Sequence, residues 1–235
     1  MRVARGFDVL GQASAVPQSG RPSASRERLR HEAIGLARVE SLIDAAYSYC
    51  IVPLDRPPSA EDLLLHAGGE TLPACWLIPA SGELTALACC VCTIGPLLEK
   101  RVTSLFAEKR ASLAVALDEL GNEMLFAVSR RAQDRIHADA HRRRLTMAGE
   151  LHAGDPGLDL SAQSTVLRLA QCENVGVALL HASIMTPLKS TAVVLGVGIA
   201  LPPVTWSRCD LCPSRTKCGI GTRSDTSALP AALTA

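Results

Sequence analysis

The fold of this chain is organised around one stretch of sequence, Leu179-Leu180-His181-Ala182-Ser183-Ile184-Met185-Thr186-Pro187-Leu188-Lys189-Ser190. This stretch lies between two runs with the composition of buried strands, residues 175–180 and 191–201. The backbone N–H and C=O groups of a polar, proline-interrupted link between two apolar strands must find hydrogen-bond partners. Connections of this kind often carry function, so we expect a site here.

The overall composition predicts a well-filled globular core. The 235 residues are 48% hydrophobic but only 3% aromatic, so the core should be built from Leu, Val, Ile and Ala. A formal net charge of +1 gives no general attraction to nucleic acid or to an anionic membrane surface. The longest apolar run, residues 190–206, is interrupted by Pro202-Pro203 and falls short of the roughly 20 residues of a membrane span.

The cysteine content indicates the compartment. The chain has nine cysteines, an odd number, in uneven clusters and without a signal-peptide pattern at its start. Disulfide frameworks belong to secreted proteins, so we interpret these residues as reduced thiols or metal ligands. A cytoplasmic location is the expectation that follows.

The amino-terminal region is predicted to be only partly ordered. The first 25 residues are rich in Gly, Ser, Pro and Arg and lack periodicity, so we expect a flexible leader. Ser25 can cap a helix that runs to about Tyr49. A short helix is predicted over residues 63–66, ended by Gly68-Gly69.

Two strands are expected next. Residues 74–79 and 84–93 have strand composition, and Ser81-Gly82 between them favours an antiparallel pair. The second strand is apolar throughout, which indicates burial on both faces. Buried free cysteine behaves as a small hydrophobe, so we predict that Cys89 and Cys90 are core residues.

Two helices follow the second strand. Pro96 suits the first turn of a helix, and its apolar face is predicted to be Leu97, Val102, Leu105 and Phe106. Apolar residues then recur at helical spacing over residues 112–144, which predicts one long helix. The arginines at its carboxyl end complement the helix dipole. We interpret them as a solvated face, with a docking surface for an acidic partner as the alternative.

These elements predict the fold class and the organisation of the chain. A loop over residues 153–159 and a helix over residues 161–172 precede the last two strands. The expected class is α+β, with a twisted, mainly antiparallel sheet and flanking helices. The expected organisation is a flexible leader, an α+β domain, a Cys-rich metal-binding segment and a flexible tail, at residues 1–25, 26–203, 204–222 and 223–235 respectively.

The Cys-rich segment predicts a metal site. Cys209, Cys212 and Cys218 have the spacing Cys-x2-Cys-x5-Cys, in which the first pair can converge on one metal ion. Neighbouring Arg and Lys residues lower thiol pKa values and stabilise an anionic thiolate site. Zinc and an iron–sulfur cluster both suit this pattern. The fourth ligand is left open, with Cys172 and the group Cys89, Cys90 and Cys92 as candidates.

Several segments resemble, in this order along the chain, the cobalamin-dependent methionine synthase activation domain family. They cover about residues 40–220, and each is weak alone, whereas their shared order makes the set more specific. The matching segments are Thr93-x-Gly95-Pro96, Asp118 to Gly121, Pro156-Gly157, Ser183-x-Met185-x-Pro187-x-Lys189-Ser190 with Val193, Val194 and Gly196, and the cysteine tail.

The resemblance implies which residues face the cofactor. In the family, the region matching residues 183–190 lies near the place where S-adenosylmethionine meets the corrinoid. The residues carried over are Gly95, Pro96, Pro156, Gly157, His181, Ser183, Met185, Pro187, Lys189 and Ser190. Relatives that bind S-adenosylmethionine read roughly Arg-x-x-Pro-Gly-Tyr in the earlier loop. Here Ala153 and Leu158 take the Arg and Tyr places, which removes a cationic donor and a phenol.

The resemblance also implies a function. The first hypothesis is reductive reactivation of a cobalamin-dependent methyltransferase, with methionine synthase as the favoured case. The partner would carry the cobalamin, an electron-donor protein would supply the electron, and the cysteine tail would relay it through an iron–sulfur cluster. The chain would then be a component of a methyltransferase system, with S-adenosylmethionine as a methyl source that its altered loop puts in question.

Two other hypotheses were weighed. The chain can instead be a non-catalytic module that docks on a corrinoid protein and holds a structural zinc in its tail. A hydrolase has little support, because His137 and His141 lack the Glu of a His-Glu-x-x-His zinc motif. Gly196-Val197-Gly198 lies in a strand-like run, so we expect a close backbone approach or a bend rather than a dinucleotide-binding turn.

Overall fold

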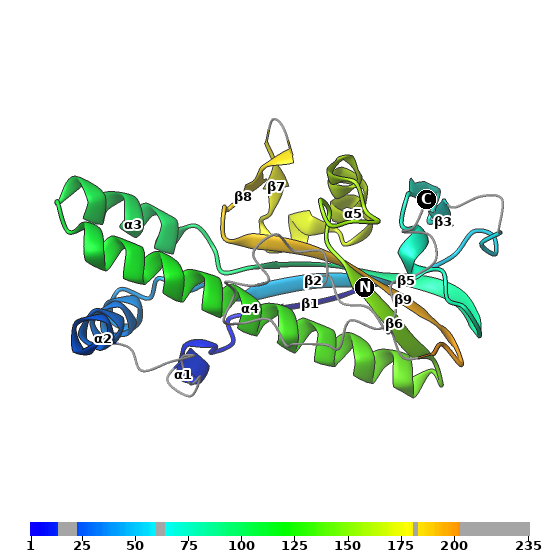
Figure 1. Ribbon diagram of the computed structural model, residues 1–235, viewed down its shortest axis with the longest axis horizontal. Coiled ribbons are helices and arrows are strands. Elements are labelled where there is room, and N and C mark those ends of the chain that lie inside the picture. Colours follow the sequence, from blue (N-terminus) through cyan, green and yellow to red (C-terminus); the bar gives the residue numbers. More distant parts are fainter. Residues whose placement is uncertain (14–22, 60–63, 181–182, 203–235) are drawn as a thin grey trace. The chain divides into compact units, whose positions relative to one another are not determined.

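The computed structural model describes residues 1–13, 23–59, 64–180 and 183–202 (Figure 1). Its helices are α1 Leu10–Ala13, α2 Ala24–Val39, α3 Leu97–Ala107, α4 Ala111–Arg142 and α5 Gln163–Leu169, with 3-10 turns η1 Cys75–Leu77, η2 Leu160–Ala162 and η3 Cys172–Val175. Its strands are β1 Arg2–Arg5, β2 Ala46–Pro53, β3 Leu65–Ala67, β4 Glu70–Leu72, β5 Glu83–Thr93, β6 Thr146–Leu151, β7 Ala178–Leu179, β8 Met185–Thr186 and β9 Ser190–Ile199.

The main sheet has five strands in the order β1-β2-β5-β9-β6, and β3-β4 and β7-β8 form two small hairpins. The β1/β2 and β6/β9 pairs are antiparallel. Backbone bonds from Asp44 to Ile94 and from Leu54 to Thr85 show that β2 and β5 also run in opposite directions. The predicted class, α+β with a mainly antiparallel sheet and flanking helices, is confirmed.

The described chain divides into two compact units. The first unit contains Met1–Tyr49, Val91–Asp134 and Gln171–Thr191, and the second contains Cys50–Cys90, Arg135–Ala170 and the chain from Ala192 onward. Among the described helices, none is long and apolar enough to cross a membrane.

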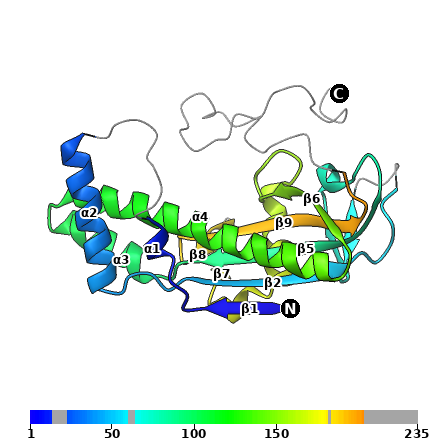
Figure 2. The same cartoon turned by 90° about the horizontal axis from the view of Figure 1, so that it is seen from below.

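The helices of the first unit pack around the first half of α4. Figures 1 and 2 show α2 and α3 beside this half of the helix. Leu113, Leu117 and Leu120 are buried on it at helical spacing, as predicted. On α3, however, Leu98 and Leu105 are buried while Leu97 and Phe106 are exposed, so the predicted apolar face is wrong at these two positions.

Ion pairs bind α2 to α4 along the same contact. The guanidinium of Arg30 bonds both oxygens of Glu123 at 2.6 and 2.7 Å. This carboxylate raises the pKa of Arg30, because it stabilises the charged guanidinium. Arg26 and Glu119 form a second, more exposed pair at 3.3 Å. The Arg30–Glu123 pair is bidentate, so its two hydrogen bonds fix the relative orientation of the two side chains in addition to bringing opposite charges together.

Strand β5 is buried on both faces, as its apolar sequence predicts. Every residue from Leu87 to Thr93 is buried. Cys89 and Cys90 are fully buried, which confirms their assignment to the core. Burial raises the pKa of Cys89 to about 12, because a thiolate loses its hydration there. Cys89 is therefore a packing residue rather than a nucleophile.

Two glycines of β9 lie against neighbouring backbone in the second unit. A Cβ on Gly198 would overlap the carbonyl oxygen of Glu83, and a Cβ on Gly196 would lie 2.9 Å from the carbonyl oxygen of Ala148. Real Cβ atoms are not accommodated so close to backbone, which explains two glycines in a strand interior. The predicted close backbone approach at Gly196-Val197-Gly198 is confirmed.

Several predicted elements are wrong at the amino-terminal end. Arg2–Arg5 is not part of a flexible leader, because it pairs with β2 as an edge strand. The first long helix begins two residues earlier than predicted, because Ser23 rather than Ser25 is its N-cap and accepts a hydrogen bond from the Arg26 amide. It ends at Val39 and not near Tyr49, since the chain then enters β2.

Other corrections concern short elements. The predicted helix over residues 63–66 is wrong for the described part, because Leu65–Ala67 is a strand that turns at Gly68-Gly69 into β4. Asp55 accepts hydrogen bonds from the amides of both glycines and so stabilises this turn. The predicted strand over residues 74–79 contains the 3-10 turn η1 instead. Strand β6 was not predicted, because Thr146–Leu151 is only partly buried and shows no strict alternation.

Candidate functional site

A small hairpin in the first unit contains described residues of the stretch from Leu179 to Ser190. Its strands β7 and β8 pair Ala178 with Thr186 and Leu179 with Met185 (Figure 1). The amide of Leu180 donates to the carbonyl of Ile184 at 2.7 Å. Among the predicted site residues, Ser183, Met185 and Pro187 belong to this hairpin, and His181 lies outside the described residues.

The hairpin presents aliphatic side chains to solvent. Leu180, Ile184 and Leu188 are 55%, 50% and 64% exposed. Isolated exposed apolar residues need no explanation, but three within nine positions of one small hairpin form a surface that a partner can cover. We call these three residues the aliphatic tip.

A network of buried hydroxyl groups fixes the carboxyl end of the hairpin. The Thr93 hydroxyl donates to the carbonyl of Lys189 at 3.3 Å and accepts from the Ser190 hydroxyl at 2.9 Å and the Gly95 amide at 3.1 Å. The Ile94 amide also donates to the Lys189 carbonyl, at 3.2 Å. The donor and both acceptor sites of Thr93 are thereby used. This network brings Gly95, Lys189 and Ser190 together, three of the predicted site residues.

Gly95 is required at this turn for two reasons. Its φ of +76° is a conformation that residues with a side chain rarely adopt. A Cβ here would also lie 3.0 Å from the Cβ of Asp44, and the amide of Asp44 donates to Ile94 at 2.9 Å. Pro96 follows as the residue before helix α3, as predicted. The Thr-x-Gly-Pro pattern therefore encodes the turn that receives the base of the hairpin.

Charged groups hold the same segment from two helices. The Lys189 ammonium lies 2.7 Å from an Asp118 carboxylate oxygen and donates to the Asn122 side-chain oxygen at 2.7 Å. The Leu188 amide donates to the Glu99 carboxylate at 2.7 Å. The Lys189 side chain is only 14% exposed, so its charge needs these partners.

The contacts of Glu99 and Asn122 were not predicted, and Asp118 entered the sequence analysis only within the matching segment Asp118 to Gly121. One signal was available for part of this set. Asp118 and Asn122 are four residues apart, and such residues lie on one face of a helix. The lysine that joins them is 67 residues beyond Asn122, and a sequence pattern does not reveal that contact.

Pro156 and Gly157 belong to the second unit, in a loop that closes on itself. The amide of Gly154 donates to the carbonyl of Leu158, and that of Leu158 to the carbonyl of Asp155. The carboxylate of Asp155 accepts from the amide of His152 at 2.9 Å. These hydrogen bonds give several backbone N–H and C=O groups of residues 152–158 a partner within the loop itself.

An indole ring lies against this loop. A Cβ on Gly157 would come within 2.5 Å of the Trp76 ring, and Gly157 has a φ of +86°. Leu158, in the place where the family resemblance expects a Tyr, is fully buried. Ala153 cannot supply the charge of the expected Arg. The residues present at this loop therefore do not fit S-adenosylmethionine as the resemblance implies, and we derive no step through that molecule here.

A polar contact joins β4 to α5 in the second unit. Arg168 donates to both carboxylate oxygens of Glu70 at 2.7 and 2.8 Å. This hydrogen bonding lowers the pKa of Glu70, because it stabilises the carboxylate. The pair is bidentate but largely exposed, so we interpret it as a structural contact of modest strength.

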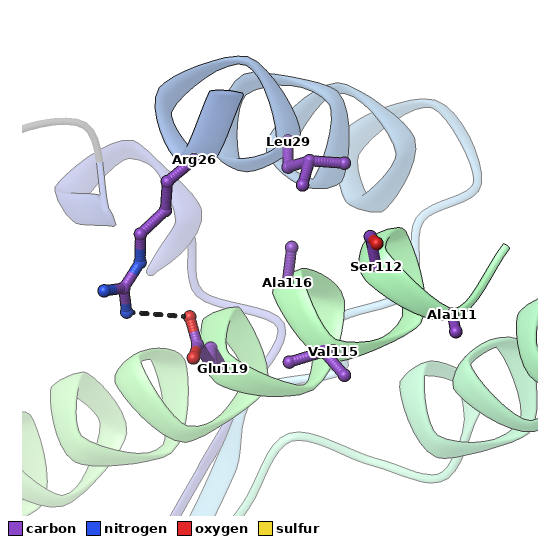
Figure 3. A pocket seen from close by; sticks show the side chains of 7 residues that line it. All are labelled: Arg26, Leu29, Ala111, Ser112, Val115, Ala116 and Glu119. Atoms are coloured by element: carbon purple, nitrogen blue, oxygen red, sulfur yellow. Dashed lines mark hydrogen bonds and ion pairs between the residues drawn. The ribbon is translucent and has the colours of Figure 1, made fainter. Parts of the chain in front are cut away.

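A shallow pocket of about 380 Å³ lies between α2 and α4 (Figure 3). Its walls are mainly Leu29, Val115 and Ala116, and the Arg26–Glu119 pair lies at one side. No predicted site residue lines it. Because Arg26 already engages Glu119, the pocket offers no separate acid or base for catalysis.

The predicted metal ligands Cys209, Cys212 and Cys218 lie outside the described residues. Within the described chain, no group of three or more His, Cys, Asp and Glu residues is arranged to hold a metal ion. His137 and His141 stack with ring centroids 6.5 Å apart on α4. The metal site of the tail therefore stays a prediction, as does the identity of its fourth ligand.

Comparison with known proteins places the fold. No protein-family model matches the chain, and no curated protein matches it in sequence. A solved structure, the MetH reactivation domain bound to AdoHcy, superposes with a TM-score of 0.59 at 9% sequence identity. The match covers 86% of this chain and 80% of that one. The chain therefore has the α+β fold of the MetH reactivation domain, although the two sequences differ at most aligned positions.

Proposed function

We propose that this protein docks on a cobalamin-dependent methyltransferase, with methionine synthase as the first candidate, and supports its reductive reactivation. The observation that carries the proposal is the fold shared with the MetH reactivation domain over 86% of the chain. The motif residues Gly95, Lys189 and Ser190, distant in sequence, meet at one hairpin base, which supports the same reading.

The chemistry of the proposal is the return of cobalt(II) to cobalt(I) in the partner. This step adds one electron to the metal, so it needs a reductant, which an electron-donor protein would supply. In the proposal, the aliphatic tip covers part of the partner and excludes water from its cofactor. Removing water strengthens the electrostatic interactions that control such a centre.

A second candidate function is a docking module that takes no part in electron transfer. The loop over residues 152–158 favours it, because Leu158 is buried and Trp76 lies directly against Gly157. Such a module would stabilise one conformation of the partner by binding it more tightly than the others. The cysteine tail would then hold zinc, which has no redox chemistry.

The experiment uses the methionine synthase of the same cell, prepared without its own reactivation domain and held as cobalt(II). The protein is added with titanium(III) citrate as reductant, with and without S-adenosylmethionine, and the recovery of methyl transfer is measured. Recovery that depends on the protein supports reactivation. Binding without recovery supports the docking module, and absence of binding contradicts both.

The cysteine tail provides a second, independent test. We expect Cys209→Ser and Cys212→Ser to abolish recovery while circular dichroism and the thermal midpoint stay unchanged. Iron, sulfide and zinc analysis of the anaerobically purified protein identifies the metal. Unchanged recovery in both variants would remove electron relay by the tail from the proposal and leave docking in place.

A further inference from the structure

The β7–β8 hairpin is too short to hold its own position. Each of its strands has two residues, and an isolated two-stranded hairpin is marginal in water even when it is longer. Its orientation must therefore come from contacts at its base. On the amino side of the hairpin, Val177 is buried and its amide donates to the carbonyl of Cys172. On the carboxyl side, contacts are made by the backbone and side chains of Leu188, Lys189 and Ser190.

The side chain of Lys189 is the longest of these contacts and reaches helix α4. Its ammonium meets Asp118 and Asn122, which lie one helical turn apart on one face of that helix. Gly121 lies between them, and a Cβ there would come within 3.4 Å of Lys189 Cε and 2.9 Å of a Leu98 methyl. The missing side chain at Gly121 leaves the space through which the lysine stem passes.

Three residues of α4 thus form the contact surface for the Lys189 side chain. Asp118 supplies charge, Asn122 supplies a hydrogen-bond acceptor and Gly121 supplies room. The Lys189 backbone carbonyl is held separately by Ile94 and Thr93. The Lys189 side chain is therefore not needed to hold the backbone at the base of the hairpin. Its contacts with α4 instead constrain the direction in which the hairpin extends from this base.

We propose that Lys189, held by Asp118 and Asn122, is a positioning residue that sets the orientation of the β7–β8 hairpin for docking. This inference rests on the proposed function for its docking part only. The hairpin carries Leu180, Ile184 and Met185, so a change in its direction moves these side chains together relative to Leu188 at its base. Removing the Lys189 charge leaves only the half-exposed Asp118 carboxylate without this partner, so the substitution should change the position of the hairpin without unfolding the protein.

The test begins with Lys189→Met, which keeps the aliphatic stem and removes the charge. Lys100→Met is the matched control, because Lys100 lies exposed on α3 in the same unit and no contact of its side chain enters the argument. Amide hydrogen exchange is followed at Leu180 and Leu188, with Leu158 of the second unit as an internal reference. We expect about 10-fold faster exchange at the two hairpin amides in Lys189→Met alone.

Docking is measured on the cobalt(II) methionine synthase described above. We expect Lys189→Met to raise the concentration of protein needed for half-maximal recovery about 5-fold, with the maximal rate within about 2-fold of wild type. Asp118→Asn should act in the same direction. A charge exchange, Lys189→Asp with Asp118→Lys, should restore part of the loss, which identifies the contact between the two side chains as its cause.

The outcomes separate this inference from the proposed function. Unchanged hydrogen exchange in both Lys189→Met and Asp118→Asn would overturn the positioning role of Lys189. Faster exchange combined with unchanged docking would also overturn the inference, because the orientation of the hairpin would then not matter for docking. If the wild-type protein does not bind the methyltransferase, the proposed function fails. The exchange measurement then still decides whether Lys189 orients the hairpin. Should Lys189→Met fail to fold, Asp118→Asn carries the test, because the Asp118 side chain is half exposed.

Discussion

Two loops of this protein contain predicted site residues, but different forces hold the two loops. The segment over residues 183–190, in the first unit, is held by groups from three other elements, including charged side chains of α3 and α4. The loop over residues 152–158, in the second unit, is held mainly by its own backbone and by one indole ring. The first exposes three aliphatic side chains, whereas the second buries its leucine.

The two kinds of contact determine how each loop can respond to its surroundings. A segment held by ion pairs and hydrogen bonds to distant elements can shift when one of those partners changes. A loop closed by van der Waals contact has few alternative arrangements, because close-packed groups leave no room. We therefore place the adaptable part of the molecule at the hairpin and the fixed part at the Pro156-Gly157 loop.

The largest expected effect tests the closed loop. Gly157→Ala puts a Cβ at 2.5 Å from the Trp76 ring in a residue with positive φ, and should lower the free energy of unfolding by about 2–3 kcal/mol. Denaturant unfolding measures this. Gly154→Ala is the control, because it has φ +95° but its Cβ would meet no atom closer than 3.7 Å. It should cost only about 1 kcal/mol. Equal losses in the two variants would refute tight packing of Trp76 on the loop.

A smaller effect tests the hydroxyl network under the hairpin. Thr93→Val keeps the shape of the side chain but leaves the Gly95 amide without its acceptor, which should cost about 1–2 kcal/mol. The midpoint and slope of urea unfolding measure the loss. Thr103→Val on the exposed surface of α3 is the matched control and should stay within about 0.5 kcal/mol of wild type. A Thr93→Val protein as stable as the control would show that the network adds nothing.

The smallest effect separates the two loops without any substitution. Raising the salt concentration from about 0.05 M to 1 M screens partly exposed charges, so we expect faster amide exchange at Leu188, whose acceptor is Glu99. The Leu158 amide, which donates to a backbone carbonyl in the closed loop, should change by less than about 2-fold. The same salt response at both amides would contradict the distinction drawn between the loops.

The long elements could be predicted because their signals are local and repeated. Helix α4 agrees with the predicted span to within two residues at each end, since apolar residues recur at helical spacing over many turns. Strands β5 and β9 were predicted from continuous apolar runs. The edge strand β1 and the partly exposed strand β6 lack such runs. Each owes its conformation to pairing with a neighbouring strand, so a local pattern does not reveal it.

The candidate site could be predicted only in part. Gly95, Lys189 and Ser190 come together at the base of the hairpin, and their cofactor-binding role stays a prediction. Pro156 and Gly157 belong to the other unit. The ligand roles of Cys209, Cys212 and Cys218 stay predictions, because these residues lie outside the described chain. The contacts of Glu99 and Asn122 were not predicted, since a polar residue on an exposed helix face has no sequence mark that identifies its partner.

The fold class, the long helix, the buried central strand and the glycines that close turns could all be predicted from the amino-acid sequence. These features follow from periodicity, burial and backbone freedom, which act among near neighbours along the chain. Only the tertiary structure decided that Lys189 meets Asp118 and Asn122, and that Trp76 covers Gly157. Such pairs join residues far apart in sequence, and the packing of whole elements selects them after local preferences have been satisfied.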